Sequence, residues 1–261
     1  MKRFIPQEIK SFIKKYFWRI YYYNKIFKTA IIKNNTFVKS ISNIISTDFN
    51  IFTKDGEDGI LLYLLKNISA SNKTFIDIGS NDCINSNCAN LAFHHGWNGC
   101  FIDGDIESLN RGKYIYSQYF KKDLGKFSFL HTIVKPDNIN ELLKSFDMTG
   151  EIDLMTMDLD GNDYHIWHSL EVVKPKIVVV EVQIEKGNED FVPKYSNTFE
   201  LYEDKNPKGA SPLSMAKLAA KKGYKLIAAN KGGFNLFFVR NDLVNQLKVL
   251  SVFDLMYDLE K

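Results

Sequence analysis

The chain has 261 residues and a mass of 30.1 kDa, enough for one domain with a full core and an extension. Its hydrophobic content of 45% and charged content of 25% are typical of a soluble globular protein and argue against a fibrous or low-complexity chain. Ten of the 34 basic residues but one of the 31 acidic residues lie within residues 1–39, so the rest carries a formal charge of −6. A basic tail on an acidic body argues against a nucleic-acid-binding surface.

Cysteine spacing and hydropathy bear on the compartment. Cys83, Cys88 and Cys100 lack the spacing of zinc ligands and predict free thiols in a reducing cytoplasm. No apolar run reaches the length of a membrane span, and the start of the chain has no uninterrupted apolar segment of the signal-peptide kind. We therefore expect a cytoplasmic protein that sits, at most, peripherally at the inner membrane surface.

Residues 4–28 predict an amphipathic helix, because apolar side chains recur there at spacings of three and four with lysines between them. The predicted apolar stripe consists of Phe4, Ile5, Ile9, Phe12, Ile13, Tyr16, Phe17, Ile20 and Tyr23. It could pack on the body or on a second subunit, rest on an anionic membrane, or meet an acidic partner. We interpret residues 1–50 as a basic helical extension and residues 51–261 as one domain, and expect the body to fold after deletion of residues 1–40.

From residue 56 onward, strand and helix patterns alternate. Strands are predicted at residues 74–78, 98–102, 127–134, 152–159, 176–182, 224–229 and 234–240, with helices at 56–65, 86–95, 106–119, 139–146, 164–170 and 211–222. The first five alternations predict a parallel sheet with helices on both faces. The last two strands are separated by too few residues for a crossover helix, so they must be antiparallel. The expected fold is a doubly wound, Rossmann-like α/β fold whose mostly parallel seven-stranded sheet ends in an antiparallel hairpin.

Two loops after predicted strands suit a ribose-containing ligand. In residues 77–83, Gly79 would let the backbone approach a ligand, and Asn81 tolerates a positive φ. At the end of the second strand, a carboxylate is placed to accept both hydrogens of a ribose diol. Asp103 is favoured for that contact and Asp105 is the reserve. A plain strand-to-helix turn and a solvated turn acid are the structural alternatives.

Acidic residues gather where the fourth and fifth predicted strands end. Asp158, Asp160 and Asp163 would repel one another, a penalty that a bound cation or a proton-accepting role would offset. Glu181 would be costly in the core and is better explained by facing the site. Asp158, Asp160 and Glu181 are candidate ligands for Mg²⁺ or Mn²⁺. Alternatively, one carboxylate or His165 accepts the proton of an attacking hydroxyl, or the acids cap the next helix.

Together these motifs resemble the FkbM-type branch of class I S-adenosylmethionine-dependent methyltransferases over residues 55–242. The resemblance rests on Asp55-Gly56-Glu57-Asp58-Gly59-Ile60, Phe75-Ile76-Asp77-Ile78-Gly79 with Asn85-Ser86-Asn87, Gly96-Trp97-Asn98-Gly99 before Phe101-Ile102-Asp103, Met157-Asp158-Leu159-Asp160-Gly161-Asn162-Asp163-Tyr164, Glu181-Val182-Gln183, Gly209-Ala210-Ser211-Pro212-Leu213 and Asn235-Leu236-Phe237-Phe238-Val239-Arg240. A terminal antiparallel hairpin also fits that class, whereas dinucleotide dehydrogenases end with a parallel strand. The chain departs from the family at Cys83, where glycine is usual, and at Asp103, where Glu is common.

The resemblance implies an O-methyltransferase that acts on a sugar, an activated sugar or a glycan precursor in surface-polysaccharide (capsule) biosynthesis. It implies S-adenosylmethionine contacts, including the loop 131–138, at Asp77, Gly79, Ser80, Asn81, Asp82, Asn87, Asp103, Asp105, His131 and Asp158. It places the substrate and catalysis near Asp158, Asp160, His165 and Glu181. Two alternatives remain: a non-catalytic binding protein with the same fold, which the Cys83 departure would fit, and a nicotinamide-dependent oxidoreductase, which the missing Gly-x-Gly-x-x-Gly disfavours.

Overall fold

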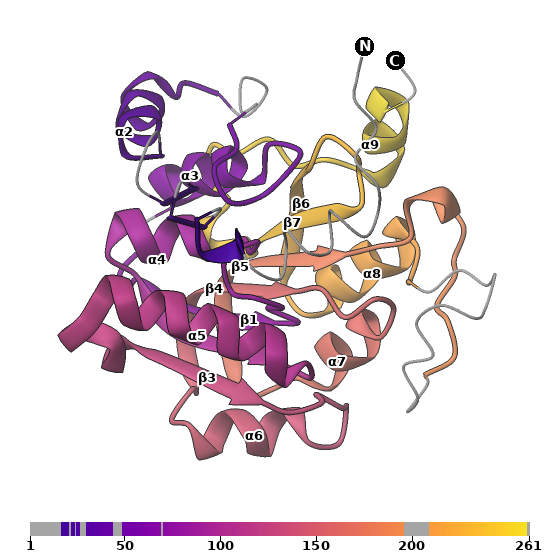
Figure 1. Cartoon of the computed structure of the whole chain (residues 1–261). Coiled ribbons are helices and arrows are strands. Elements are labelled where there is room, and N and C mark those ends of the chain that lie inside the picture. The colour runs from indigo at the N-terminus through magenta and orange to yellow at the C-terminus, as the bar shows by residue number, and fades with distance from the viewer. Residues whose placement is uncertain are drawn as a thin grey trace, which may run out of the picture.

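The computed structural model describes residues 17–20, 22–23, 25–26, 30–43, 49–68, 70–195 and 209–259. A seven-stranded sheet with the order β3-β2-β1-β4-β5-β7-β6 forms its centre (Figure 1). The strands are β1 (Thr74–Ile78), β2 (Asn98–Asp103), β3 (Phe127–His131), β4 (Gly150–Met157), β5 (Val173–Glu181), β6 (Tyr224–Ala229) and β7 (Asn235–Arg240). Only β7 runs against the others, pairing antiparallel with both β5 and β6. The predicted doubly wound sheet with its antiparallel hairpin is confirmed.

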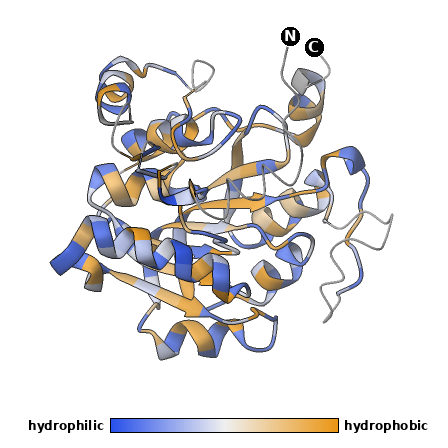
Figure 2. Ribbon diagram, viewed as in Figure 1, coloured by the Kyte–Doolittle hydropathy of each residue, from blue (hydrophilic) through white to orange (hydrophobic). Residues whose placement is uncertain are grey.

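Helices cover both faces of the sheet, which is why the central strands are apolar on both sides (Figure 2). Residues such as Phe75 and Leu154 point to one face, where α3 (Glu57–Asn67), α4 (Ala89–His95) and α5 (Ile106–Phe120) pack. Their neighbours Ile76 and Met155 point to the other face. That face is covered by α6 (Ile139–Ser145), α7 (Asp163–Ser169), α8 (Pro212–Lys221) and α9 (Val252–Leu259).

Several boundaries differ from the prediction because side chains compete with the regular backbone pattern. Helix α4 begins at Ala89 instead of residue 86, since the Ser86 hydroxyl accepts the Cys88 N–H (3.0 Å) in a local turn that precedes the helix. Strand β5 begins at Val173, where the backbone already pairs with Gly150 of β4. Strand β3 ends at His131, three residues before the predicted end.

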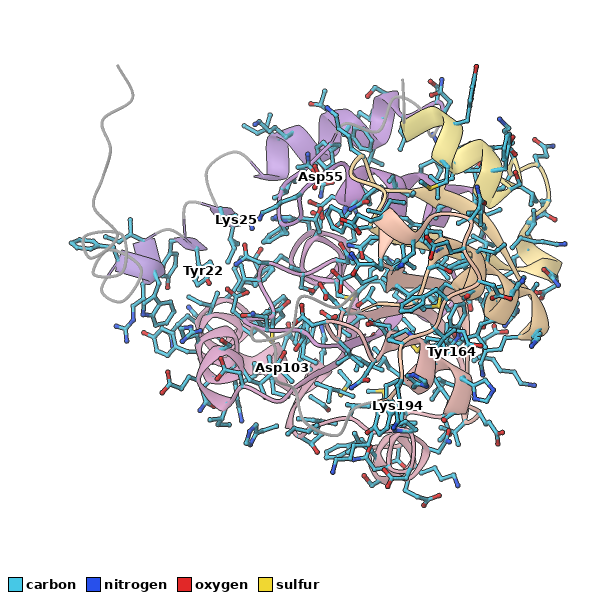
Figure 3. All side chains as sticks on the ribbon, turned by 90° about the vertical axis from the view of Figure 1, so that its right-hand side faces the viewer. Tyr22, Lys25, Asp55, Asp103, Tyr164 and Lys194 are labelled. Carbon is cyan, nitrogen blue, oxygen red and sulfur yellow. The ribbon has the colours of Figure 1, made fainter. Side chains whose placement is uncertain are left out.

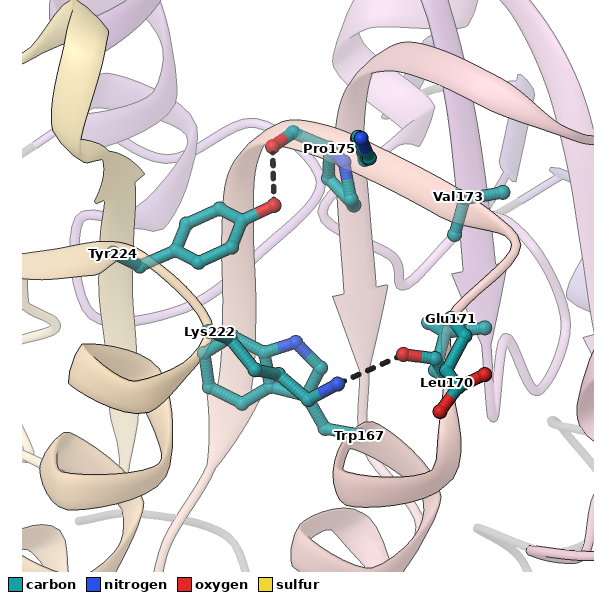
Figure 4. A pocket seen from close by; sticks show the side chains of 8 residues that line it. Trp167, Leu170, Glu171, Val173, Pro175, Lys222 and Tyr224 are labelled. Carbon is teal, nitrogen blue, oxygen red and sulfur yellow. Dashed lines mark hydrogen bonds between the residues drawn. The ribbon is translucent and has the colours of Figure 1, made fainter.

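The amino edge of the sheet holds a small pocket of about 240 Å³ between α7, β5 and the start of β6 (Figure 4). Its principal polar groups are engaged with the protein itself. Lys222 Nζ donates to the Leu170 carbonyl (2.8 Å), and Tyr224 Oη donates to the Pro175 carbonyl (2.7 Å). The pocket lies at the edge where β5 and β6 begin. Ligands of such folds bind at the opposite edge, where the parallel strands end.

The described part of the N-terminal extension is helical at residues 17–20, 22–23 and 25–26, and α2 (Ala30–Ser40) follows it. The predicted stripe does not pack on the body here, because Phe17, Ile20 and Tyr23 are exposed. Tyr22 and Ile26 are buried instead, in the same cluster as α4 and α5. This helix carries apolar side chains on all of its sides, so their spacing alone could not show which side faces inward. Residues 4–16 of the stripe lie outside the described residues.

Contact of the outer face with a membrane or a second subunit stays a prediction, as does the domain division at residue 50. None of the described helices combines the length and the apolar composition that crossing a bilayer requires. Burial of Tyr22 and Ile26 changes the expectation for the truncation, because deletion of residues 1–40 would remove side chains from the core.

We predict that Ile26→Ala lowers the free energy of unfolding by about 2–4 kcal/mol, the usual loss for a large-to-small change in a core. The matched control Ile20→Ala should change it by less than about 0.5 kcal/mol, because that side chain is exposed. Urea unfolding followed by circular dichroism measures both values. Equal stabilities of the two variants would contradict the placement of Ile26 in the core.

Candidate active site

The order of the sheet reverses between β1 and β4, and the loops after β1, β2, β4 and β5 meet at the carboxyl edge there. Gly79 and Asp158 directly follow β1 and β4, and Asp103 and Glu181 end β2 and β5. The sequence placed all four in the site. Figure 3 looks toward this edge, and residues from separate parts of the chain, among them Asp103, lie around it. Ligands of open α/β sheets bind at such a switch point.

Gly79 brings the loop after β1 into contact with the loop after β4. Its φ is +79°, and a Cβ atom at this position would lie 1.8 Å from the Asp158 carbonyl oxygen. Only glycine fits both the backbone conformation and the close approach. The loop of residues 79–88 is thereby fixed against the acidic residues that follow β4. It is called the cofactor loop below, after the cofactor contacts that the sequence predicts in it.

Buried hydrogen bonds of Asp77 and Ser80 connect the cofactor loop to the sheet. The buried Asp77 carboxylate accepts hydrogen bonds from the Ser86 hydroxyl and from Thr156 Oγ1 of β4 (2.7 Å). Burial raises the pKa of Asp77 to about 6, although both hydroxyls favour the charged form. The Ser80 hydroxyl is also buried and donates to the Ile102 carbonyl (3.4 Å). Both residues, predicted as cofactor contacts, are placed to support the loop.

Asn87 carries an unpaired hydrogen-bond acceptor in the cofactor loop. Its Oδ1 atom is buried and has no hydrogen-bond partner among the described residues. A buried unpaired carbonyl oxygen is destabilising unless an N–H or O–H group reaches it. This orphaned oxygen in the cofactor loop therefore fits a ligand that carries a donor, such as an ammonium group.

The structure separates Asp103 from Asp105. Asp105 caps α5, accepting from the Glu107 N–H (2.9 Å) and the Ser108 hydroxyl (2.6 Å), and the Ser108 bond lowers its pKa. The Asp103 carboxylate accepts from the Asn81 and Asp105 backbone N–H groups at the rim of the site. His131 lies beside this rim, with Nε2 3.1 Å from the Gly104 carbonyl oxygen. Asp103 is therefore the better candidate for a ribose contact.

Asp158, Asp160 and Glu181 form the acidic cluster that the sequence predicted. One carboxylate oxygen of each lies within 4.8 Å of the others. Asp158 and Glu181 share a hydrogen bond, and burial followed by the charge of Asp158 raises the pKa of Glu181 well above its ordinary value. Desolvation by the surrounding protein, followed by the charge of Asp160, raises the pKa of Asp158 as well. Glu181 therefore keeps its proton to a higher pH than an ordinary glutamic acid, and in the protonated form it donates a hydrogen bond to Asp158 instead of repelling it.

Asp163 and His165, also predicted near the site, form hydrogen bonds with the main chain. The buried Asp163 accepts from the Leu159 (3.0 Å) and Gly161 (3.2 Å) N–H groups, which makes it the capping acid of this loop, and burial raises its pKa to about 7. His165 Nε2 lies 2.8 Å from the Pro193 carbonyl oxygen. A carbonyl only accepts, so this nitrogen carries hydrogen and is not free to take a proton. Pro193 thus engages Nε2 of His165, whereas the Asp158 carboxylate lies within the acidic cluster.

Glu57 is a site residue that our reading of the sequence did not single out. It begins α3, is buried, and its Oε1 accepts from the side-chain amides of Asn230 and Asn235 (2.7 Å each). Burial raises the pKa of Glu57 to about 7, and the charge of Asp158 adds to this shift. Asn235 pairs with Glu181 across β5 and β7. The signal was present, since Glu57 lies in the segment 55–60 that carries the resemblance, but nothing in the sequence joined it to β5.

No family model and no curated protein matches the chain. Among solved structures, the mitomycin 7-O-methyltransferase MmcR is similar at 13% identity and a TM-score of 0.40, over 71% of this chain and 56% of that one. An O-methyltransferase family protein from Burkholderia thailandensis is similar at 12% identity and a TM-score of 0.45, over 71% and 58%. An S-adenosylmethionine-dependent methyltransferase from Clostridium acetobutylicum ATCC 824 is similar at 11% identity and a TM-score of 0.43, over 86% and 97%.

The chain thus spans little more than half the length of the first two of these proteins. The strand order and the antiparallel β7 described above give it the class I methyltransferase fold.

We predict that Gly79→Ala abolishes ligand binding or folding, because the added methyl group would overlap the Asp158 carbonyl. Gly96→Ala is the matched control, since Gly96 also has a positive φ (+71°) but open space around its Cβ position. It should lose only about 1–2 kcal/mol of stability, the penalty for a left-handed alanine. Circular dichroism and thermal unfolding compare the two, and similar losses in both would refute the close-approach argument.

Proposed function

We propose that the protein is an S-adenosylmethionine-dependent methyltransferase. The observation that carries the proposal is the meeting, at the β1–β4 switch point, of the glycine-bearing cofactor loop, a rim carboxylate at Asp103 and the acidic pair Asp158–Glu181. In an open α/β sheet this is where a ligand with a ribose binds. The antiparallel β7 argues against the nicotinamide-dependent alternative, whose sheet ends with a parallel strand.

The residues present suit the cofactor. Asp103 would hold the ribose diol, the unpaired Oδ1 of Asn87 would accept from an amino group, and Gly79 fixes the cofactor loop against the chain that follows β4. An edge rich in carboxylates also favours a positively charged sulfonium compound. When bound, S-adenosylmethionine supplies an electrophilic methyl group.

For the acceptor we propose a hydroxyl group of a sugar, an activated sugar or a glycan precursor, the class that the FkbM-type resemblance implies. Carboxylates at the site accept hydrogen bonds from such hydroxyls and hold them in line for methyl transfer. Asp158 is suited to take the hydroxyl proton because its pKa is raised toward the working pH. A Mg²⁺ or Mn²⁺ ion held by Asp158, Asp160 and Glu181 is the alternative role of the cluster.

Titration calorimetry with S-adenosylmethionine tests the cofactor. We predict binding to the full chain and a loss of about 1.5–3 kcal/mol in Asp103→Ala, the range for hydrogen bonds to a charged group. Asp105→Ala is the control and should bind nearly as well, because Asp105 caps α5. Absence of binding to the unchanged protein would refute the proposal, and a loss confined to Asp105→Ala would move the ribose contact there.

Methyl transfer from labelled S-adenosylmethionine to a panel of activated sugars tests the reaction. We predict that turnover falls about 10²-fold or more in Asp158→Asn, the scale for a lost positioned base, and by more than the affinity for the cofactor falls. A base works deprotonated, so turnover of the unchanged protein should rise as the pH passes upward through the raised pKa of Asp158. Loss of activity in EDTA with recovery in Mg²⁺ would favour the metal role, whereas cofactor binding without transfer would favour a non-catalytic binding protein.

A further inference from the structure

The N-terminal segment, defined here as residues 17–20, 22–23 and 25–26, contacts the cofactor loop directly. Tyr22 Oη donates to a carboxylate oxygen of Asp82, and Lys25 Nζ donates to Asn85 Oδ1 (2.7 Å). Tyr22 and Lys25 lie three residues apart in helical chain, so their side chains point to the same side. In Figure 3, which looks onto the carboxyl edge of the sheet, both residues lie to the left of that edge.

Asp82 and Asn85 are the residues that close the turn of the cofactor loop. The Asp82 carboxylate accepts from the backbone N–H groups of Ile84 (3.0 Å) and Asn85 (2.8 Å) and from Asn85 Nδ2 (2.8 Å). The Asn85 amide is therefore held at both ends, by Asp82 and by Lys25. Four side chains, two from the N-terminal segment and two from the loop, form one continuous hydrogen-bonded chain. Asp82, predicted as a cofactor contact, is saturated by protein donors.

The N-terminal segment is itself firmly seated. Tyr22 and Ile26 are 7% and 1% exposed, and the Trp18 ring meets Tyr22 and Tyr114 of α5 edge-on with centroids 6.0 and 5.8 Å apart. Lys25 also donates to the Phe52 carbonyl (2.7 Å). The segment thus holds the loop from a fixed position.

The backbone of the cofactor loop needs such an external hold. Asn81 and Cys83, on either side of Asp82, have φ values of 47° and 57°, in the left-handed region that non-glycine residues rarely occupy. Such conformations persist where the surrounding structure over-determines them. The hydrogen bonds to Asp82 supply that constraint beside Cys83, the less tolerant of the two, since asparagine adopts a positive φ more readily.

We propose that Tyr22 and Lys25 are positioning residues, which hold the cofactor loop in its ligand-binding conformation so that the N-terminal extension sets the affinity for S-adenosylmethionine. This inference rests on the proposed function. A loop released from Tyr22 and Lys25 has to be ordered when the ligand binds, and that ordering weakens binding. Neither side chain is assigned a part in methyl transfer.

Titration of the full chain with S-adenosylhomocysteine measures the effect. We expect about a fivefold to tenfold higher Kd for Tyr22→Phe and for Lys25→Met, as for the loss of one well-formed hydrogen bond. The controls Tyr23→Phe and Lys33→Met alter exposed residues of the same types and should bind as the unchanged protein does. With an acceptor in hand, KM for S-adenosylmethionine should rise while kcat at saturation stays the same. Lys25→Arg, which retains a donor, should restore part of the affinity.

Hydrogen exchange gives a second readout that does not depend on the ligand. The amides of Ile84 and Asn85 donate to Asp82, so they should exchange faster in Tyr22→Phe and Lys25→Met than in the two controls. Lys25 is only partly buried, so Lys25→Met tests the inference if Tyr22→Phe does not fold.

The outcomes separate the two proposals. If the unchanged protein binds S-adenosylhomocysteine and both variants bind it equally well with unaltered exchange, the positioning role is wrong and the proposed function stands. If kcat falls with KM unchanged, the two residues act in catalysis and the inference is also wrong. If the unchanged protein does not bind, the proposed function and this inference fall together.

Discussion

The approach of Gly79 to the Asp158 carbonyl is the constraint on which the rest of the site depends. A side chain at residue 79 would overlap the main chain after β4, so glycine alone allows the loops after β1 and β4 to touch. Asp77 reinforces this contact because its carboxylate accepts hydrogen bonds both from Thr156 of β4 and from Ser86 of the cofactor loop. Two loops that come from strands far apart in the sequence are thereby fixed as one unit. A ligand bound to the cofactor loop necessarily lies beside the acidic cluster.

This joining concentrates carboxyl groups in one place, and burial is the largest cause of the raised pKa of Asp77, Glu57 and Asp163. The pKa is about 6 for Asp77 and about 7 for Glu57 and Asp163, and those of Asp158 and Glu181 are raised as well. Between the ordinary carboxyl pKa and these raised values, the folded protein binds more protons than the unfolded chain. Its stability therefore falls as the pH rises through this window. The site keeps groups that destabilise the fold near neutral pH, as expected where carboxyls poised to exchange protons serve chemistry.

The sequence predicted the parts of the structure that depend on local pattern and on the geometry of parallel sheets. Apolar runs located all seven strands. Because parallel strands end at the same edge of a sheet, the sequence also predicted that Gly79, Asp103, Asp158 and Glu181 lie close together. Contacts between elements that share no pattern could not be predicted. Glu57 joins the site because Asn235 at the start of β7 donates to its carboxylate, and His165 contacts the Pro193 carbonyl from a separate part of the chain. Strand β5 begins early because pairing with β4, not β-branched composition, sets its start.

The N-terminal extension shows how an error about one helix face changes the interpretation of a whole segment. Spacing identified a stripe that includes Phe17, Ile20 and Tyr23, but the buried face carries Trp18, Tyr22 and Ile26, one residue further round the helix. With Tyr22 facing inward, its hydroxyl group reaches Asp82, and the extension becomes a support of the cofactor loop. Such support is reciprocal. A ligand that favours the ordered cofactor loop must favour the seated N-terminal segment by the same free energy. The exposed face of that segment, with Phe17, Ile20 and Tyr23, therefore belongs to an element whose position is thermodynamically linked to the site.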